Sequence, residues 1–202
     1  MQQRTNFAAL TLGLTRGAEY QAAIMAYFNQ LAGTDVLTDV PKYVGDIVRY
    51  HLLDINGEKS VTFFDTGLGS PSALSTNMGD SFTSKENEHM IVTAIEYLES
   101  DTTAATADLA TFTKGIANAQ LVTSQMSILS GGSKTMQNWA MSDFLAVTNE
   151  GLEGTVDLAV PQVWLAQTDY PIQVKARGTN AFTAANTNLF VICKVRGVGL
   201  LA

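Results

Sequence analysis

The chain has 202 residues, which suits one domain with a core of its own. It carries a formal net charge of −7, which argues against a protein whose whole surface binds nucleic acid. Charged residues make up only 15%, whereas a typical soluble domain has about 25%. So few charges indicate a surface partly covered by other protein, most simply by copies of the same chain. The alternative is a low-charge soluble monomer.

Charge is distributed unevenly along the chain. Residues 35–169 are strongly acidic, whereas residues 170–202 contain no Asp or Glu. That last segment carries four bases, Lys175, Arg177, Lys194 and Arg196. The asymmetry predicts a basic face toward an anionic partner and an acidic face toward the medium. Chance clustering of four bases is the alternative.

The single cysteine and the N-terminus bear on the cellular setting. Cys193 has no second cysteine to pair with, and its apolar neighbours predict a small buried side chain. The first residues do not lead into the apolar run of about 7–15 residues that marks a signal peptide. No stretch approaches the ~20 apolar residues of a membrane span. Synthesis in the cytoplasm is expected.

Residues 15–33 give the strongest helical pattern. Thr15 is a suitable N-cap and Gly33 a suitable C-terminal stop. One apolar stripe at helical spacing comprises Tyr20, Ile24, Tyr27, Phe28 and Leu31. The residues before the helix are small and apolar, as in a terminal arm. The pattern leaves open whether the helix packs on its own domain or on a neighbouring subunit.

The sequence changes to a strand pattern after Pro41. Asn56-Gly57 is the strongest hairpin signal in the chain, and residues 66–80 form a loop rich in Gly and Pro. Three strands are predicted in this part, at residues 46–55, 59–65 and 88–98, and the first is rich in Ile, Val, Tyr and Leu.

Residues 102–119 are rich in Ala and Thr and predict a short helix or a long loop. A weak helical stripe favours a short helical insertion near residue 110; its members are Asp108, Leu109, Phe112 and Ile116. Strand patterns resume at Gln120 and continue over residues 134–147 and 156–165. Pro161 predicts an edge or a bulge in the last of these.

The two C-terminal strands show the clearest alternation. In residues 171–177, apolar side chains face one side and Lys175 and Arg177 the other. In residues 188–198, the same alternation places Lys194 and Arg196 opposite the apolar face. If the two strands are close in space, the four bases project from one surface.

These elements predict a mainly β fold. Eight to ten strands without regular βα alternation exclude a parallel α/β sheet and leave a sandwich or barrel. A single eight-stranded jelly roll with an N-terminal helix fits the strand number and the length. We expect residues 1–40 to form an arm and helix, and residues 41–202 to form the jelly-roll domain.

Residues typical of active sites occur without the spacing that catalysis needs. His51 and His89 lie in apolar strand-like segments without a second His or Cys nearby, which favours structural roles over metal ligation. No Gly-x-Ser-x-Gly turn is present, and residues 131–134 lack the first glycine of a phosphate loop. Carboxylate pairs such as Glu96 with Glu99 are interpreted as solvated or interface charges. We therefore predict no enzyme activity.

No cofactor is expected, and calcium is the only metal for which the sequence offers ligands. Clustered loop carboxylates suit a hard cation. The chain has four candidates, although their spacing matches no recognised calcium loop: Asp35, Asp39, Asp80 and Asp101.

Two patches of the chain resemble a known family. The first ends an aromatic strand and resumes after a Gly/Pro loop, with the residues Phe63, Phe64, Asp65, Thr76, Asn77 and Met78. The second comprises Val163-Trp164-Leu165, Asp169-Tyr170-Pro171 and the two strands that close the chain. Both patches resemble jelly-roll capsid proteins of tailless icosahedral, often lipid-containing bacteriophages.

The resemblance implies a self-assembling capsid subunit, found in the virion. It implies trimeric or pentameric capsomers with upright barrels, and partners that are copies of the chain and other virion proteins. The basic face would turn toward genome or an internal membrane, no small-molecule substrate is implied, and the motif residues would anchor core and loops. Many relatives are longer double jelly rolls, which leaves open a major, minor or penton role.

Two other functions remain open at this point. A lectin-like carbohydrate- or receptor-binding β-sandwich would share the fold, with Trp139 or Trp164 as the aromatic platform, although both lie in apolar segments. Another virion subunit, such as a tail or spike protein, would form stacked rings rather than closed shells.

Overall fold

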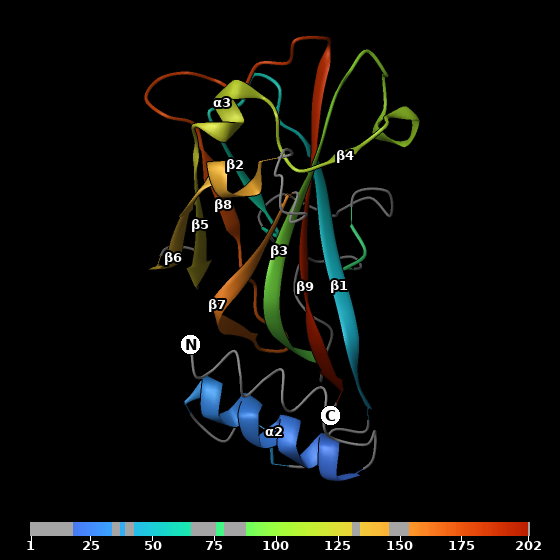
Figure 1. The fold of residues 1–202 in the computed structure, drawn as a ribbon, viewed down its shortest axis with the longest axis vertical. Coiled ribbons are helices and arrows are strands. Elements are labelled where there is room, and N and C mark those ends of the chain that lie inside the picture. Colours follow the sequence, from blue (N-terminus) through green and yellow to red (C-terminus); the bar gives the residue numbers. More distant parts are fainter. Residues whose placement is uncertain are drawn as a thin grey trace.

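The computed structural model describes residues 18–33, 37–38, 43–65, 76–78, 88–130, 134–145 and 154–201. In this part of the chain, nine strands form two antiparallel sheets (Figure 1). The large sheet comprises β1 (Tyr43–Asp54), β3 (Glu88–Thr102), β4 (Thr113–Lys114), β7 (Thr155–Trp164) and β9 (Asn188–Leu201). The small sheet comprises β2 (Ser60–Phe63), β5 (Gln125–Ser130), β6 (Lys134–Ala140) and β8 (Ile172–Lys175).

The strand pairs are nested around one hairpin. β5 pairs with β6, β3 with β7, β2 with β8, and β1 with β9, so each outer pair encloses the inner ones along the chain. Two further pairings, β9 with β3 and β8 with β5, join these ribbons side by side. The resulting orders are β1-β9-β3 followed by β7 and β4 in the large sheet, and β2-β8-β5-β6 in the small one.

The main core fills the space between the sheets. Its residues come from alternate positions of facing strands, such as Val191 and Val195 of β9 and Ile172 and Val174 of β8. This confirms the alternation expected for the C-terminal strands. Tyr97 lies fully buried at the centre, with its ring centroid 4.8 Å from that of Phe144.

A second apolar cluster forms on the outer face of the large sheet. Helix α2 (Ala18–Ala32) packs its side chains on this face near one end of the molecule (Figure 1). Ile24, Tyr27 and Phe28 are buried there, against Ile91 and Leu200 among others. The helix therefore packs on its own domain, which was one of the two alternatives. No helix in the described residues has both the length and the apolar character that crossing a bilayer requires.

The segment between β3 and β5 differs from its prediction. The helical insertion near residue 110 is only one 3-10 turn, η2 (Ala107–Leu109), followed by the short strand β4. The strand predicted from Gln120 begins at Gln125, because residues before it form the helical turn α3 (Ala119–Val122). Asn118 caps this turn through its side-chain oxygen, which accepts from the backbone N–H groups of Gln120 and Leu121.

A β-bulge sits in the middle of the large sheet. Val92 pairs with Gly197 and Ala94 with Arg196, so Thr93 is an extra residue in β3. On the other side of β3, Gln162 and Asp157 of β7 are the successive partners, which leaves residues 158–161 outside the register. Pro161 falls in this irregular stretch, as the sequence predicted.

Gly197 is the residue that lets β9 pass the bulge. A Cβ on Gly197 would lie 1.8 Å from the carbonyl oxygen of Ile91, which is backbone and cannot move aside. A Cβ on Gly199 would meet only the flexible side chain of Ile47, at 3.2 Å. The two glycines are therefore unequal, although they lie two residues apart on the same strand.

We expect Gly197→Ala to lower the free energy of unfolding by about 3 kcal/mol or more, because the new methyl group displaces backbone. Gly199→Ala is the matched control and should cost less than about 1 kcal/mol, since alanine is favoured over glycine in a strand interior. Urea denaturation of both variants measures the difference. Equal losses would show that the bulge does not require glycine.

Candidate functional site

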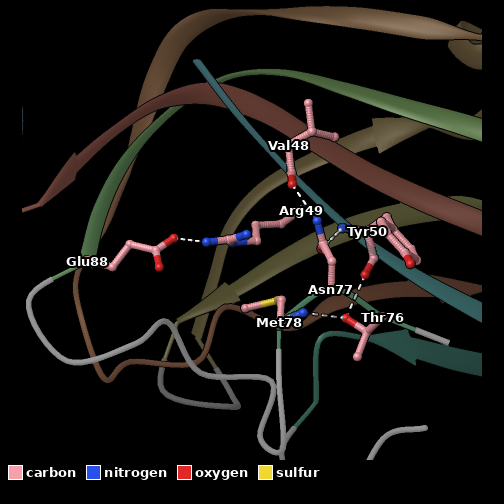
Figure 2. A network of polar contacts seen from close by, with 7 residues as sticks. All are labelled: Val48, Arg49, Tyr50, Thr76, Asn77, Met78 and Glu88. Carbon is pink, nitrogen blue, oxygen red and sulfur yellow. Dashed lines mark hydrogen bonds and ion pairs between the residues drawn. The ribbon is translucent and has the colours of Figure 1, made fainter. Parts of the chain in front are cut away.

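The free edge of β1 is covered by a short segment that follows the first loop. The backbone N–H of Tyr50 donates to Asn77 Oδ1 at 2.9 Å, and Asn77 Nδ2 donates to the carbonyl of Val48 at 2.8 Å (Figure 2). The side-chain amide of Asn77 thus makes the two hydrogen bonds that a neighbouring strand would make. Exposed sheet edges are templates for pairing with other chains. Asn77 blocks the edge of β1 because its side-chain oxygen and nitrogen take the places of a peptide carbonyl and a peptide N–H.

Thr76 secures the same segment. Its hydroxyl donates to the carbonyl of Tyr50 at 2.6 Å and accepts from the N–H of Met78 at 3.2 Å (Figure 2). Thr76 also forms an isolated antiparallel bridge with His51. Thr76, Asn77 and Met78 are therefore held at the edge of β1 by hydrogen bonds of the Thr76 and Asn77 side chains.

The other motif residues lie beneath this edge. Phe63 and Phe64 are buried in the main core, and Phe64 adopts a positive φ of 59°. Its backbone N–H donates to His51 Nδ1 at 2.9 Å. The His51 ring also contacts both phenylalanine rings, at centroid distances of 5.8 Å. His51 therefore holds the chain in the turn at Phe64, a conformation that L-residues rarely adopt.

Burial keeps His51 neutral. Desolvation lowers the pKa of His51 to about 4, and the opposing effect of nearby Asp65 is smaller. A neutral ring is needed here because Nδ1 accepts a hydrogen bond. His89 is similar in kind: its Nδ1 accepts from the N–H of Ala166 at 3.1 Å, and burial lowers its pKa. Its ring packs edge-on against Phe28 of α2.

Arg49 and Glu88 form an ion pair on the inward side of the large sheet. Arg49 is opposite Val195, whose side chain is in the core, so both share the inner face. Glu88 lies at the start of β3, and its carboxylate meets the guanidinium (Figure 2). Their side chains are only 18% and 9% exposed. Burying two charges is tolerable only because each neutralises the other.

A second ion cluster lies on the outer face of the large sheet. Glu96 is opposite Lys194 in the register, and its carboxylate lies 3.5 Å from Lys194 Nζ and in contact with the guanidinium of Arg196. The Glu96 side chain is 3% exposed, whereas those of Lys194 and Arg196 are 26% and 46% exposed. The two bases lie over the carboxylate, and the exposed Asp157 of β7 lies in the same row of the sheet as Arg196, with Ala94 between them.

The structure places the four predicted bases on two sheets. Lys194 and Arg196 project from the outer face of the large sheet, on β9. Lys175 is exposed on β8 of the small sheet, and Arg177 is exposed just after it. Since the inner faces of β8 and β9 share one core, the two pairs point away from each other. The four do not meet on one surface.

The carboxylates of β3 were interpreted as solvated, and the structure corrects this. Glu96 and Glu99 are both buried. The Glu99 carboxylate accepts from the N–H groups of Ala117 and Asn118, and burial raises its pKa. The burial of these residues was missed because their partners lie far along the chain: two bases for Glu96 and two backbone N–H groups for Glu99. The alternation Ile95-Glu96-Tyr97 was the available signal that Glu96 opposes the core face.

Of the four predicted calcium ligands, only Asp101 lies among the described residues. Asp101 instead binds its own chain, since its carboxylate accepts from the N–H groups of Ala185 and Asn186 at 2.6 and 2.8 Å. Asp35, Asp39 and Asp80 lie outside the described residues. Across the described ranges, no group of three or more His, Cys, Asp or Glu side chains is arranged to hold a metal ion.

The remaining predicted residues are mostly buried. Trp164 is 2% exposed and stacks on Tyr170 with centroids 5.2 Å apart, and Trp139 packs partly buried against the main core. Cys193 is fully buried, and burial raises its pKa to about 12. In α2, Leu31 packs beside the buried stripe, and the side chain of Tyr20 lies outside the described set.

Comparisons with known proteins give a distant likeness to a solved structure. No protein-family model matches the sequence, and no curated protein matches it significantly. Among solved structures, a chain of the cyanophage Pam1 capsid asymmetric unit aligns over 83% of this chain and 92% of that chain, at 14% sequence identity and a TM-score of 0.34. A likeness of this size does not establish a shared fold or function.

Replacing Asn77 tests the covered edge of β1. We expect Asn77→Ala to lower the free energy of unfolding by about 1–2 kcal/mol, because two hydrogen bonds to the backbone are lost. Asn180→Ala is the matched control, since Asn180 is exposed just after the turn at residues 178–179. Urea denaturation gives the loss, and equal losses in both variants would contradict the role of Asn77.

Acid should destabilise the protein through His51. The folded pKa of about 4 lies below the usual 6.5, so the unfolded chain binds a proton that the folded chain does not. This contribution is complete above pH 6.5 and is lost as the pH falls from 6.5 to 4, by about 3 kcal/mol. Chemical denaturation across this range should give a shallower pH dependence for His51→Gln than for wild type. An unchanged slope would show that His51 does not titrate this way.

Proposed function

We propose that this chain is a structural virion protein, a capsid subunit that assembles with copies of itself and has no enzymatic role. The observation that carries the proposal is the nested strand pairing. With the two-residue β4 set aside, eight strands form pairs β1·β9, β2·β8, β3·β7 and β5·β6 in two four-stranded sheets. One long antiparallel ribbon folded over in this way is the topology we assign as a jelly roll, an architecture that virus shells use.

The surface composition supports assembly. Only 15% of the residues are charged, although a free monomer depends on surface charge for solubility. In the part of the chain that the structure describes, three large apolar side chains on the outside are more than 40% exposed: Val48, Leu109 and Val160. The edge of β1 is blocked by Asn77, which favours contacts through side chains over unregulated strand pairing.

The finer assignment follows the family resemblance. We assign residues 1–40 to an N-terminal arm and helix and residues 41–202 to the jelly-roll domain. Trimeric or pentameric capsomers, other virion proteins as partners, and a location in the virion belong to this proposal. For the basic residues, Lys175 and Arg177 are the pair free to face genome or anionic lipid head groups, since Lys194 and Arg196 share Glu96.

The two alternatives have less support. A sugar-binding platform needs an exposed aromatic ring, and Trp164 is buried while Trp139 packs against the core. A tail or spike subunit would share the self-association and differ in symmetry. Images of assembled protein separate this alternative from a shell.

The mass of the purified chain in solution tests the proposed function. We expect trimers, pentamers or closed shells by light scattering, and rings or shells in negative-stain images of the same sample. Raising the protein concentration should increase the assembled fraction. A monomer of 21.6 kDa that stays dispersed at high concentration would contradict the capsid function, and stacked tubes would favour a tail subunit.

A further inference from the structure

One asparagine side chain joins the turn between β1 and β2 to residues 181–187, the loop that precedes β9. Asn56 Nδ2 donates to the carbonyl of Thr187 at 2.9 Å, and Asn56 Oδ1 accepts from the N–H of Ala184 at 3.0 Å. The side chain is nevertheless exposed to water. Asn56 is followed by Gly57, and this is the only Asn-Gly pair in the sequence. The exposed amide is therefore both a structural link and a group with a reactive neighbour.

An Asn-Gly pair readily loses the amide nitrogen of its asparagine, because glycine has no side chain to hinder the approach of its backbone. The backbone nitrogen of Gly57 attacks Asn56 Cγ, a C–N bond forms and the Cγ–Nδ2 bond breaks. Nδ2 leaves as ammonia and carries away the amide proton of Gly57. Water then opens the five-membered succinimide at either carbonyl, which gives aspartate or isoaspartate at position 56. Water is the only co-reactant that the two steps need.

The fold engages both reacting groups in hydrogen bonds. The N–H of Gly57 donates to the carbonyl of Phe182 at 2.8 Å, so the attacking nitrogen is bound to the loop. The N–H of Phe182 in turn donates to the carbonyl of Glu58 at 2.8 Å. The Asn56 amide is bound to the same loop. The reaction therefore requires a local opening in which the 181–187 loop leaves the turn.

Asp101 of β3 holds the same loop from another direction. Its carboxylate accepts from the N–H groups of Ala185 and Asn186 at 2.6 and 2.8 Å. Asn186 Nδ2 also donates to this carboxylate at 3.0 Å and to the carbonyl of Asp101 at 3.2 Å. Loss of the Asp101 carboxylate thus loosens the loop while the Asn-Gly pair itself stays unchanged.

We propose that Asn56 is a deamidation site controlled by the 181–187 loop: the docked loop suppresses the reaction, and its opening permits it. The product also opposes renewed docking. A carboxylate at position 56 has no proton to donate to the carbonyl of Thr187. It also adds a negative charge between Asp54 and Glu58, which are both exposed acids. Deamidation therefore makes a transient opening permanent, and this inference is independent of the capsid function.

Peptide mapping by mass spectrometry measures the reaction in the full chain at mildly alkaline pH. We expect Asn56 to deamidate roughly tenfold or more slowly in folded wild type than in the urea-unfolded chain, because the loop opens only transiently. Asp101→Ala should speed the reaction in the folded protein by roughly threefold or more for the same reason. Asp46→Ala is the matched control, since Asp46 is an exposed acid near the other end of β1. Its deamidation rate should equal that of wild type.

A milder variant protects this test against a loss of folding. Asn186→Ala removes the two hydrogen bonds from Asn186 Nδ2 to Asp101 and keeps the two backbone N–H groups that bind the carboxylate. It should speed deamidation of Asn56 less than Asp101→Ala does. Urea denaturation confirms that each variant is folded.

Hydrogen exchange measures the effect of the product. Asn56→Asp reproduces one of the two products, and we expect it to speed exchange in residues 181–187 by roughly tenfold or more. Exchange in β5 and β6 should stay as in wild type. Asn180→Asp is the matched control, because Asn180 is exposed just before the loop and the change adds the same charge. Its exchange in the loop should be that of wild type.

Each part of the inference has an outcome that overturns it. A lack of deamidation at Asn56 even in the unfolded chain would refute the site. Equal rates in folded and unfolded wild type, or unchanged rates in both Asp101→Ala and Asn186→Ala, would refute control by the loop. Loop exchange in Asn56→Asp no faster than in Asn180→Asp would refute the effect of the product. None of these results bears on the capsid function, which the solution mass tests separately.

Discussion

The bulge at Thr93 sets the direction of the side chains along the central strand of the large sheet. Before it, Met90 and Val92 point into the main core and Ile91 points out toward α2. After it, Ile95 and Tyr97 point inward. If Thr93 continued the regular alternation instead of bulging, Tyr97 would point to the outer face, because a shift of one residue turns every later side chain over. The bulge therefore takes up Thr93 and keeps Ile95 and Tyr97 on the core side of the sheet, and Gly197 provides the space for it.

The charge on the outer face follows from this arrangement. Because the bulge places Glu96 outward, it lies beside Lys194 and Arg196 of the adjacent strand instead of in the core. The carboxylate is covered by its two partners, so desolvation is offset by two opposite charges. Arg49 and Glu88 use the same solution on the inner side. Two of the buried acids of β3, Glu88 and Glu96, are thus each paired with bases from other strands of the large sheet.

Features set by local sequence could be predicted, and features set by distant partners could not. Alternation in β8 and β9 is visible in the sequence, and the expected turn and helix stop occur where Gly57 and Gly33 take positive φ values. The bulge was hidden because residues 90–95 form a nearly continuous apolar run, which has no alternation to interrupt. The burial of Glu96 was hidden for another reason, since its partners come from a strand almost 100 positions later.

The edge of β1 is covered, whereas part of the outer face of the large sheet is exposed, and this difference affects how the chain can associate. Asn77 satisfies the backbone of β1 at Val48 and Tyr50, so strand addition at this point would first have to displace two hydrogen bonds. On the outer face of the same sheet, Leu52, Leu98 and Ile192 are partly exposed and belong to neither apolar cluster of the described residues. Backbone pairing has no inherent limit in number or register, whereas contacts between side chains fix one geometry. A chain that closes its edge and leaves its face open favours assemblies of defined size over fibres.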